Sequence, residues 1–571
     1  MILSWWNECR IAQYERRLTM FFRTKWNGYH RYLQVVENRW EGGRSRQHVA
    51  WTVGRLDVLE KSGELESLLR SGLRFTKRLA VLDAGRAEQQ AGTKGTIIGP
   101  GLVFERLWKE TGIQAVVRKA VEERKYTFAV ERAVFLTVLH RLFAPGSDRA
   151  AEEWKEGYRI EGAEGLQLHQ LYRAMAWLGE KLPRKMQPVV KGHSPRCVKD
   201  KLEEMLFAGR QTLFGGLDMV FFDTTSLYFE GAGGETLGEN GLSKDKRPDL
   251  KQMVVGAVLD QEGNPVCSEM WPGNTTDVTT LVPVVRRLKR EFGVEQMCAV
   301  ADRGMISAKT IATLESKPYG MEYILGARMR RTKEVREDVL MRCGRWHEVY
   351  PPRTRSKDPS PLKVKEVMVE DRRYIVCHNE EQARKDAADR EAIVAALREA
   401  LRQGDKSLIG NKGFRKFVKA TGERFTIDEE RIEDDARFDG KWVLRTNTGL
   451  NAADVALKYK QLWMVEDIFR SMKSLLATRP IYHRSDATIR GHVFCSFLAL
   501  ILRKALQDRL DGCGLHSLEW AHIVQDLNQL REAEVTVSGK RFVLREECKG
   551  SVGHVLRAVG VAPPPTMREV T

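Results

Sequence analysis

The sequence predicts a mixed α/β fold, and three observations in the middle of the chain support it. LDMVFFD (217–223) is an apolar strand, and KQMVVGAVLD (251–260) is a second strand that turns at QEGN into a hairpin partner, PVCSEMWPGN (265–274). TTLVPVVRRLKREFG (279–293) has the spacing of an amphipathic helix. EQMCAVADRG (295–304) then returns as another apolar strand. Three strands, a helix and a further strand form one mixed α/β layer.

Before this layer the pattern changes from strands to helices. Residues 21–57 alternate aromatic or β-branched residues with charges and are broken at Asn-Gly and Gly-Gly, which is typical of β-hairpins. From about residue 60 to 210 the apolar spacing is helical, as in ERAVFLTVLHRLFA, which is stopped by Pro145-Gly146. This region is rich in Arg and Lys, so we predict that it binds DNA, although no helix-turn-helix can be assigned.

After the layer, the sequence predicts an interruption and then a return to the core. Residues 321–440 combine strand-like pieces with the charged helix EQARKDAADREAIVAALREALRQ, and we interpret them as an insertion. FDGKWVLRTNTG (438–449) resumes as a strand and leads into two helices, of which the second, at 489–510, is buried. The predicted divisions are an N-terminal hairpin region, a helical DNA-binding region, the first part of the core, the insertion, the second part of the core and a C-terminal extension, at residues 1–60, 61–210, 211–320, 321–440, 441–510 and 511–571.

The composition is that of a globular protein with a polyanionic partner. The chain has 571 residues, which is too long for a single core, with 42% hydrophobic and 30% charged residues. The formal net charge of +17 is spread along the chain and indicates nucleic acid as the first candidate partner. The nine cysteines are scattered without a CxxC, and no HExxH occurs. Neither a zinc ribbon nor a disulfide framework is therefore expected.

No signal peptide or membrane span is expected. The start, MILSWWNECRIAQYERRLTM, carries early charges where an apolar segment would be needed, and Met20 is an alternative start to Met1. The longest apolar run, VFCSFLALIL (493–502), lies between Arg490 and Arg503 and is too short to cross a bilayer. We therefore expect a cytoplasmic protein.

The stretch YKQLWMVEDIFRSMK (459–473) predicts a helix with two distinct faces. Tyr459, Glu466 and Lys473 follow one another at seven-residue steps, and seven residues at 100° each come within about 20° of two full turns. These three side chains should therefore stack in one row. A separate apolar stripe has the spacing of a helix that lies on a core, and it consists of Val465, Ile468, Phe469, Met472, Leu475 and Leu476.

Two predicted strands end on an aspartate directly after an apolar run, VFFD at Asp223 and CAVAD at Asp302. A carboxylate held at a strand end suits a hard divalent cation that prefers oxygen ligands. With Glu466, three carboxylates could converge on two Mg²⁺ ions, one activating an attacking oxygen and one stabilising the leaving oxygen of a phosphodiester. The alternatives are a turn or cap role for each aspartate and an ion pair between Glu466 and Arg470.

Together, the motifs FFDTTS, SKDKRPDLKQMVVG, WPGNTTD, VADRGM and YKQLWMVEDIFRSMK, followed by RPIYHR and GHVF, resemble those of DDE transposases of bacterial insertion sequences. They are similar to the IS-four group, whose signature helix reads Y-x2-R-x3-E-x6-K. The resemblance extends from the N-terminal hairpin to about residue 510. It implies an RNase H-like catalytic core, a mixed sheet with helices, interrupted by a β-rich insertion between the second aspartate and the glutamate.

The resemblance implies the catalytic residues and the cofactor. Asp223 and Asp302 correspond to the two catalytic aspartates, and Glu466 to the glutamate that completes a site for Mg²⁺, with Mn²⁺ as a substitute. Transposition exchanges phosphodiesters directly, so no nucleotide cofactor is expected. In agreement, the loop GDKSLIGNKG (404–413) lacks the GK[ST] ending of a Walker motif.

The resemblance also implies contacts to DNA. Tyr459 and Lys473 match the signature residues that contact DNA phosphate near the cleavage point. The signature Arg position is occupied by Leu462, and Arg470, one turn beyond Glu466, could supply the missing phosphate contact.

A further basic segment precedes the second strand. SKDKRPDLKQ (243–252) contains Lys244, Lys246 and Arg247, which either hold a DNA backbone or form a solvated charged loop.

We therefore expect a Mg²⁺-dependent transposase in the bacterial cytoplasm, associated with the nucleoid. It would bind the terminal inverted repeats of its own element, cleave there and join the 3′ ends to target DNA, at least as a dimer on double-stranded DNA and without a membrane. Three alternatives remain open. These are a catalytically silent DNA-binding protein, an RNase H-fold nuclease without strand transfer, and a glycosidase that uses two of the carboxylates.

Overall fold

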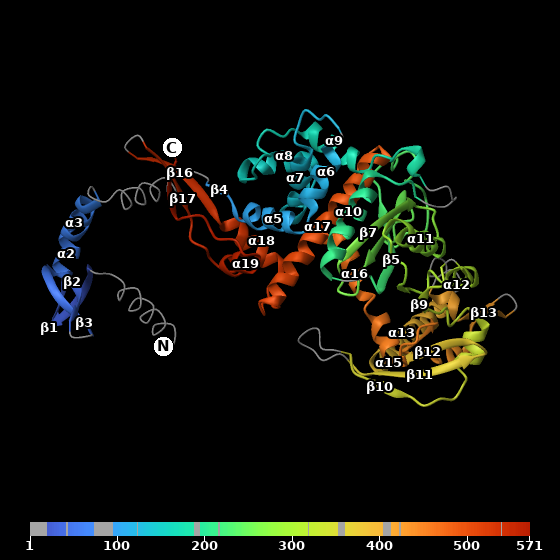
Figure 1. The fold of residues 1–571 in the computed structure, drawn as a ribbon. Helices are drawn as coiled ribbons and strands as arrows, with labels where there is room; N and C mark the ends of the chain where they lie inside the picture. The colour runs from blue at the N-terminus through green and yellow to red at the C-terminus, as the bar shows by residue number, and fades with distance from the viewer. Residues whose placement is uncertain are drawn as a thin grey trace. The chain divides into compact units, whose positions relative to one another are not determined.

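The computed structural model shows a chain that divides into two compact units (Figure 1). One unit comprises residues 1–96, 531–547 and 564–571, and the other comprises residues 97–530 and 548–563. The residues that the structure describes are 20–41, 44–73, 95–122, 124–187, 194–214, 217–317, 319–351, 360–403, 413–421, 424–537 and 540–570. Most of the GDKSLIGNKG loop lies outside these residues, as does Met1, whereas the alternative start Met20 is the first residue described.

The first unit begins with a three-stranded antiparallel sheet, β1 (Met20–Asn27), β2 (His30–Glu41) and β3 (Arg44–Arg55). The hairpin predicted at Asn-Gly is confirmed, because β1 and β2 pair on either side of a two-residue turn in which Gly28 has a φ of +61°. Two helices follow, α2 (Leu56–Ser62) and α3 (Glu64–Leu73). Three strands of this unit, β16 (Arg531–Val537), β17 (Lys540–Arg545) and β18 (Met567–Val570), pair antiparallel in a second sheet with the order β18-β17-β16-β4, where β4 is Thr96–Ile97.

The second unit combines a helical part and a large sheet. The helical part contains α5 (Gly99–Glu110), α6 (Ile113–Glu122), α7 (Val130–Phe143), α8 (Asp148–Trp154), α9 (Leu168–Leu178), α10 (Val198–Phe214), α17 (Asp486–Gly512), α18 (Trp520–Gln529) and α19 (Val552–Val559). Every residue of α7 is buried, which is consistent with a helix at the centre of this part. The buried helix predicted at 489–510 is confirmed as α17, which crosses α9 so closely that a β-carbon on Gly491 would lie 1.9 Å from Met175 O.

The sheet of the second unit has nine strands in the order β10-β11-β12-β15-β9-β8-β5-β6-β7. Its strands are β5 (Met219–Tyr228), β6 (Gln252–Leu259), β7 (Pro265–Pro272), β8 (Cys298–Ala301), β9 (Glu322–Gly326), β10 (His347–Val349), β11 (Leu362–Val369), β12 (Arg372–His378) and β15 (Lys441–Thr446). β8 pairs in parallel with β5 and with β9, and the other pairs are antiparallel. The predicted mixed α/β fold is therefore confirmed.

Helices cover both faces of this sheet. Val220 and Phe222 of β5 face a core shared with α11 (Leu281–Glu291) and α12 (Ala308–Glu315). The alternate residues Met219 and Phe221 face a second core that includes residues of α15 (Ala452–Lys460) and α16 (Trp463–Arg470). Because successive side chains of a strand point to opposite faces, β5 is held in register by both cores.

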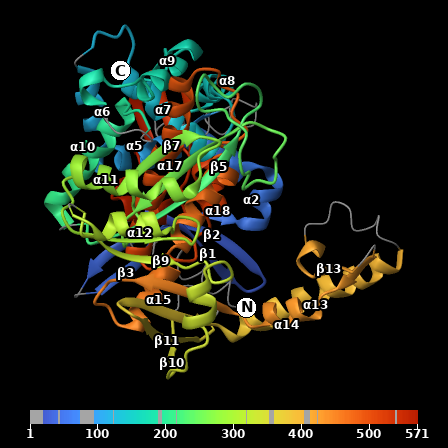
Figure 2. The same ribbon diagram turned by 90° about the vertical axis from the view of Figure 1, so that its right-hand side faces the viewer.

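The segment 321–440 contributes to the sheet and also extends beyond it. Strands β9 to β12 continue the core sheet, whereas the excursion between β12 and β15 contains α13 (Glu380–Gln403), the hairpin β13 (Val418–Thr421) and β14 (Arg424–Ile427), and α14 (Glu429–Ala436). Figure 2 shows α13, α14 and β13 projecting away from the strands. None of the helices in the described part of the chain is long and apolar enough to span a membrane.

A buried charge network fastens α10 to β7 and α11. Lys199 Nζ donates to Ser268 O at 2.7 Å, and Glu203 accepts hydrogen bonds from the amide and hydroxyl of Ser268 at 2.9 and 2.7 Å. Arg287 of α11 pairs with Glu203 at 2.8 Å and with Glu269 at 2.9 Å. Burial alone would lower the pKa of Lys199, but the neighbouring carboxylates raise it, so the ammonium remains charged.

We expect Arg287→Met to destabilise the protein strongly. The substitution leaves the buried carboxylates of Asp200 and Glu203 with one counter-ion fewer, which costs about 3 kcal/mol or more. Urea denaturation of the full chain measures the loss. Arg398→Met is the matched control, because Arg398 pairs with Glu429 while 59% exposed, and equal effects of the two substitutions would contradict the prediction.

Candidate active site

The parallel pairing of β5 with β8 brings two of the predicted site residues together. Phe222 pairs with Ala301, so the next residues along the two strands are Asp223 and Asp302. β8 ends at Ala301, as predicted, but β5 does not end at Asp223. It continues to Tyr228 in antiparallel pairing with β6, so the prediction that Asp223 ends its strand is wrong. Asp223 instead lies one residue beyond the end of the pairing with β8, so β5 has no strand partner on that side at Asp223.

The two aspartates interact electrostatically. The pKa of Asp223 is raised to about 6. Burial is the largest cause and the Asp302 carboxylate acts in the same direction, whereas the Lys244 ammonium and the Thr224 amide lower the pKa. The Thr224 amide donates to Asp223 Oδ1 at 2.7 Å. Burial thus leaves the negative charge of Asp223 poorly compensated, which is a condition that a bound cation would relieve.

Tyr459 is bonded to the second aspartate. Its hydroxyl donates to Asp302 Oδ1 at 2.9 Å, and burial together with that carboxylate raises its pKa well above the usual value. The Tyr459 hydroxyl packs against Gly326 of β9, so closely that a β-carbon on Gly326 would lie 2.5 Å from the hydroxyl oxygen. In this arrangement Tyr459 orients a carboxylate.

The predicted continuous helix at 459–473 is wrong. α15 ends at Lys460, a turn follows, α16 begins at Trp463, and the chain continues as a π-helical segment, η7 (Ser471–Leu475). Tyr459, Glu466 and Lys473 therefore do not extend one straight α-helical row. The apolar stripe is confirmed. Ile468 and Leu475 are partly buried, and the other four residues are buried, namely Val465, Phe469, Met472 and Leu476.

Glu466 lies on the exposed side of α16. Its carboxylate has no hydrogen-bond or ion-pair partner among the described residues, and Arg470 pairs instead with Asp467 at 3.5 Å. Within the described ranges, no three His, Cys, Asp or Glu side chains are spaced to hold a metal ion. The structure thus brings Asp223 and Asp302 together but does not complete a three-carboxylate group with Glu466.

The predicted DNA-contacting residues of the signature helix differ in their surroundings. Lys473 is mostly buried and pairs with Asp245 at 2.9 Å, and Arg479 contacts the same carboxylate at 3.3 Å. Arg470 is 68% exposed. Leu462, at the signature Arg position, is packed in the core between the sheet and α16, so its side chain serves packing.

The basic loop 243–252 is also tied to carboxylates. Lys244 pairs with Asp277 at 3.3 Å, and Arg247 pairs with Asp249 at 2.8 Å while its guanidinium lies over the ring of Tyr228. Lys246 is exposed and has a left-handed backbone, with a φ of +58°.

Asp277 is the site residue that the sequence did not assign. It opens the 3₁₀ turn η3 (Asp277–Thr279), and its Oδ1 accepts a hydrogen bond from the Thr224 hydroxyl at 2.7 Å. It stands in the motif WPGNTTD, so the motif itself was the available signal. Asp277 is far along the chain from Asp223 and Asp302, so the sequence alone did not indicate its contact with Thr224 beside Asp223.

The motifs RPIYHR and GHVF form a buried junction. A ring nitrogen of His483 lies 3.1 Å from one of His492, and Arg141 of α7 lies 2.8 Å from the same His492 nitrogen. Burial, followed by the Arg141 charge, lowers the pKa of His483 to about 4. Both histidines are therefore neutral at neutral pH and join the chain after η7 to α17 and α7.

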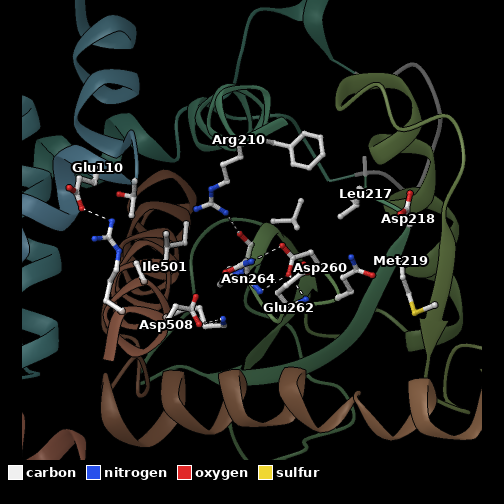
Figure 3. A pocket seen from close by; sticks show the side chains of 18 residues that line it. Glu110, Arg210, Leu217, Asp218, Met219, Asp260, Glu262, Asn264, Ile501 and Asp508 are labelled. Atoms are coloured by element: carbon white, nitrogen blue, oxygen red, sulfur yellow. Dashed lines mark hydrogen bonds and ion pairs between the residues drawn. The ribbon is translucent and has the colours of Figure 1, made fainter. Parts of the chain in front are cut away.

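A cavity of about 560 Å³ lies away from this site, at the beginning of β5 (Figure 3). Met219, Asp260 and Ile501 line it, together with Arg210, whose guanidinium donates to Pro265 O at 3.3 Å. Because the cavity lies at the start of β5 and Asp223 lies just beyond the end of the pairing with β8, the cavity is separate from the candidate active site.

A mixed sheet with central parallel strands, covered by helices on both faces and carrying two aspartates side by side, defines an RNase H-like core. Residues 216–502, just over half of the chain, match the transposase DDE domain, and residues 22–88 match the N-terminal domain of IS1634 family transposases. The chain belongs to the DDE transposases of insertion sequences, as its motifs predicted.

Two further comparisons accompany this assignment. A solved structure described as the cryo-EM structure of the piggyBac transposase synaptic complex with hairpin DNA is similar over 75% of this chain and 76% of its own, at 9% identity and a TM-score of 0.35. No curated protein matches the chain.

We expect the stability of the protein to depend on the protonation of Asp223. Its pKa of about 6 exceeds the value near 3.9 of an unfolded chain, so folded protein binds the proton more tightly and stability falls as the pH rises from about 4 to about 6. Asp223→Asn removes this loss. In EDTA at pH 7.5 the variant should be more stable than the wild type, by on the order of 2 kcal/mol, and at pH 4 the difference should shrink. Urea denaturation at both pH values measures it, and an equal difference at both would contradict the prediction.

Proposed function

We propose that this protein binds the terminal inverted repeats of its own insertion sequence, cleaves DNA at the element ends and joins the 3′ ends to target DNA. The observation that carries the proposal is the placement of Asp223 and Asp302 side by side, through the pairing of β5 and β8, in a chain with a DDE transposase domain. Two ends must be brought together, so we propose at least a dimer on double-stranded DNA, in the bacterial cytoplasm and associated with the nucleoid.

The site residues fit divalent cations. Asp223 and Asp302 offer hard carboxylate oxygens, burial leaves the charge on Asp223 poorly compensated, and the described residues provide no partner for the Glu466 carboxylate. These three residues would hold two Mg²⁺ ions, or Mn²⁺ as a substitute, which would activate the attacking oxygen and stabilise the leaving oxygen of a phosphodiester.

The protein groups around the carboxylates position them. The Tyr459 hydroxyl holds Asp302, and the Thr224 amide holds Asp223. Arg470, exposed on the same helix as Glu466, and Lys473, in the following segment η7, are the proposed phosphate contacts. Because Lys473 already pairs with Asp245, a phosphate would take the place of that carboxylate.

The N-terminal sheet offers a surface for DNA in addition to the helical region. Residues 20–55 contain seven Arg or Lys but two Glu, whereas the following residues 56–73 contain two basic and four acidic residues. Trp26 and Trp51 are 65% and 55% exposed, and the Arg31 guanidinium lies 5.5 Å from the centre of the Trp26 ring. Cationic and aromatic side chains on an exposed sheet are suited to the DNA backbone.

The alternatives predict different chemistry. A catalytically silent DNA-binding protein would bind the ends without cutting, and an RNase H-fold nuclease would cut without joining. The match to a transposase domain removes the support for a glycosidase.

We expect Glu466→Gln to bind the element end without cutting it. The change keeps the size of the side chain but removes the charge needed to hold a second cation, so cleavage should fall by at least about 10³-fold. The measurement is cleavage and strand transfer of a labelled duplex carrying the element's own end, with Mg²⁺.

Glu429→Gln, an exposed change on α14, is the matched control and should cut like the wild type. If the wild type binds but cuts with neither Mg²⁺ nor Mn²⁺, the silent DNA-binding alternative is correct. Cutting without joining would identify the nuclease.

We expect Arg31→Ala to weaken DNA binding in a salt-dependent way. Loss of one phosphate contact should reduce the slope of log affinity against log salt by about one. Fluorescence anisotropy of the end duplex at several salt concentrations measures the slope. Arg398→Ala on α13 has the same change in net charge and should leave the slope unchanged. If Arg31→Ala and Arg398→Ala give identical slopes, Arg31 does not contact DNA and the binding surface lies on another part of the protein.

A further inference from the structure

Asp277 lies beside the two segments that carry Asp223 and Asp302. Its Oδ1 accepts the hydrogen bond from the hydroxyl of Thr224, the residue that follows Asp223 on β5. On the other side, a β-carbon on Gly304, two residues beyond Asp302, would lie 3.4 Å from Asp277 Oδ2. Asp277 is thus a fourth carboxylate beside the site, in contact with β5 and with the loop after β8.

Lys244 is the counter-ion of this carboxylate and is held from three sides. Its Nζ lies 3.3 Å from Asp277 Oδ2 and donates to Thr224 O at 2.7 Å and to Thr224 Oγ1 at 2.9 Å. Its backbone amide donates to Ser226 Oγ at 2.8 Å, which fixes the basic loop to β5. The ammonium is therefore built into the edge of the site.

The positive charge of Lys244 acts on the carboxylate of Asp223. After burial, it is the largest influence on the pKa of Asp223, which it lowers, and Asp277 acts in the opposite direction. Lys244 thus partly neutralises the carboxylates that a divalent cation would neutralise. An ammonium and a cation close to the same carboxylates repel each other.

We propose that Lys244 and Asp277 are positioning residues that couple cation binding to DNA binding: Asp277 holds the Lys244 ammonium at the carboxylates in the free protein, and Lys244 turns to a DNA phosphate when cations are bound there. The inference rests on the proposed function, because it requires that Asp223 and Asp302 hold the cations. Lys244 is 33% exposed on its side chain, so it can reach a phosphate after a change of rotamer.

The proposal predicts opposite effects of the two residues on cation affinity. Lys244→Met removes a positive charge beside the carboxylates and should tighten binding of Mn²⁺ by on the order of tenfold. Asp277→Asn removes a negative charge, while the Lys244 ammonium keeps its two hydrogen bonds to Thr224 and its repulsion of the cation, so the substitution should weaken binding by a similar factor. The double variant restores the charge balance and should bind Mn²⁺ nearly as the wild type does.

The experiment titrates the full-length protein with Mn²⁺ alone and follows free Mn²⁺ by electron paramagnetic resonance, then repeats the titration with the end duplex. In the wild type, DNA should raise Mn²⁺ affinity, and by linkage Mn²⁺ should raise DNA affinity by the same factor. Lys244→Met should bind Mn²⁺ more tightly without DNA and should lose most of the further gain on adding DNA. A purely structural role would weaken Mn²⁺ binding in every variant.

Matched controls carry the same charge changes on exposed residues of the excursion and its surroundings. Lys333→Met and Asp434→Asn remove charges that are 85% and 45% exposed, and both should leave Mn²⁺ affinity unchanged. Thermal unfolding verifies that every variant is folded.

Asp302→Asn separates failure of this inference from failure of the proposed function. If wild type and Asp302→Asn bind Mn²⁺ alike, the cations are not held at this site and the proposed function fails. If Asp302→Asn abolishes binding but Lys244→Met and Asp277→Asn shift affinity in the same direction, or no more than the exposed controls, the positioning role of Lys244 and Asp277 is overturned.

Discussion

The proposed active site depends on the pairing of four residues of β5 with four of β8. This parallel ladder runs from Met219 and Cys298 to Phe222 and Ala301, and it brings into proximity two aspartates that are far apart in sequence. A slip of one residue would turn every side chain of β5 to the opposite face. The slip is resisted because Phe221 and Phe222 are each almost fully buried, on opposite faces, in different cores. The geometry of the carboxylates is thus secured by apolar packing behind them.

The helical part is attached to this sheet by charge rather than by apolar contact alone. Lys199 and Glu203 of α10 meet Arg287 and the backbone of β7 in a network that is almost completely buried. Such groups are costly to bury unless each is paired, and here the pairing satisfies several of them at once. Because the bonds are directional, they fix the orientation of α10 against the sheet. Apolar surfaces alone would allow the helix to slide.

The local pattern of apolar residues predicted the strands and the helix faces, but not the contacts between distant parts of the chain. The alternation and length of the apolar runs gave the strands around Asp223 and Asp302, and helical spacing gave the stripe from Val465 to Leu476. The break between α15 and α16 has no helix-breaking residue at its site, since Gln461 and Leu462 are both compatible with a helix. The turn there is accompanied by burial of Leu462 in the core and by the bond from Tyr459 to Asp302, both of which are tertiary. The same holds for Asp277, whose partners are Thr224 of β5 and Lys244 of the loop 243–252.

The basic residues near the site have a common feature that bears on how DNA is recognised. Lys244, Lys473 and Arg247 are each paired with an aspartate, and Lys244 and Arg247 both belong to the loop 243–252. A phosphate that binds such a cation must replace a carboxylate, so the net gain is smaller than for a cation that is free in solvent. In the proposed function, affinity for DNA would then come mainly from surfaces such as the N-terminal sheet, where cations outnumber carboxylates. On the same proposal, the paired cations would respond to a correctly placed phosphate, which favours selectivity at the site of reaction over tight binding there.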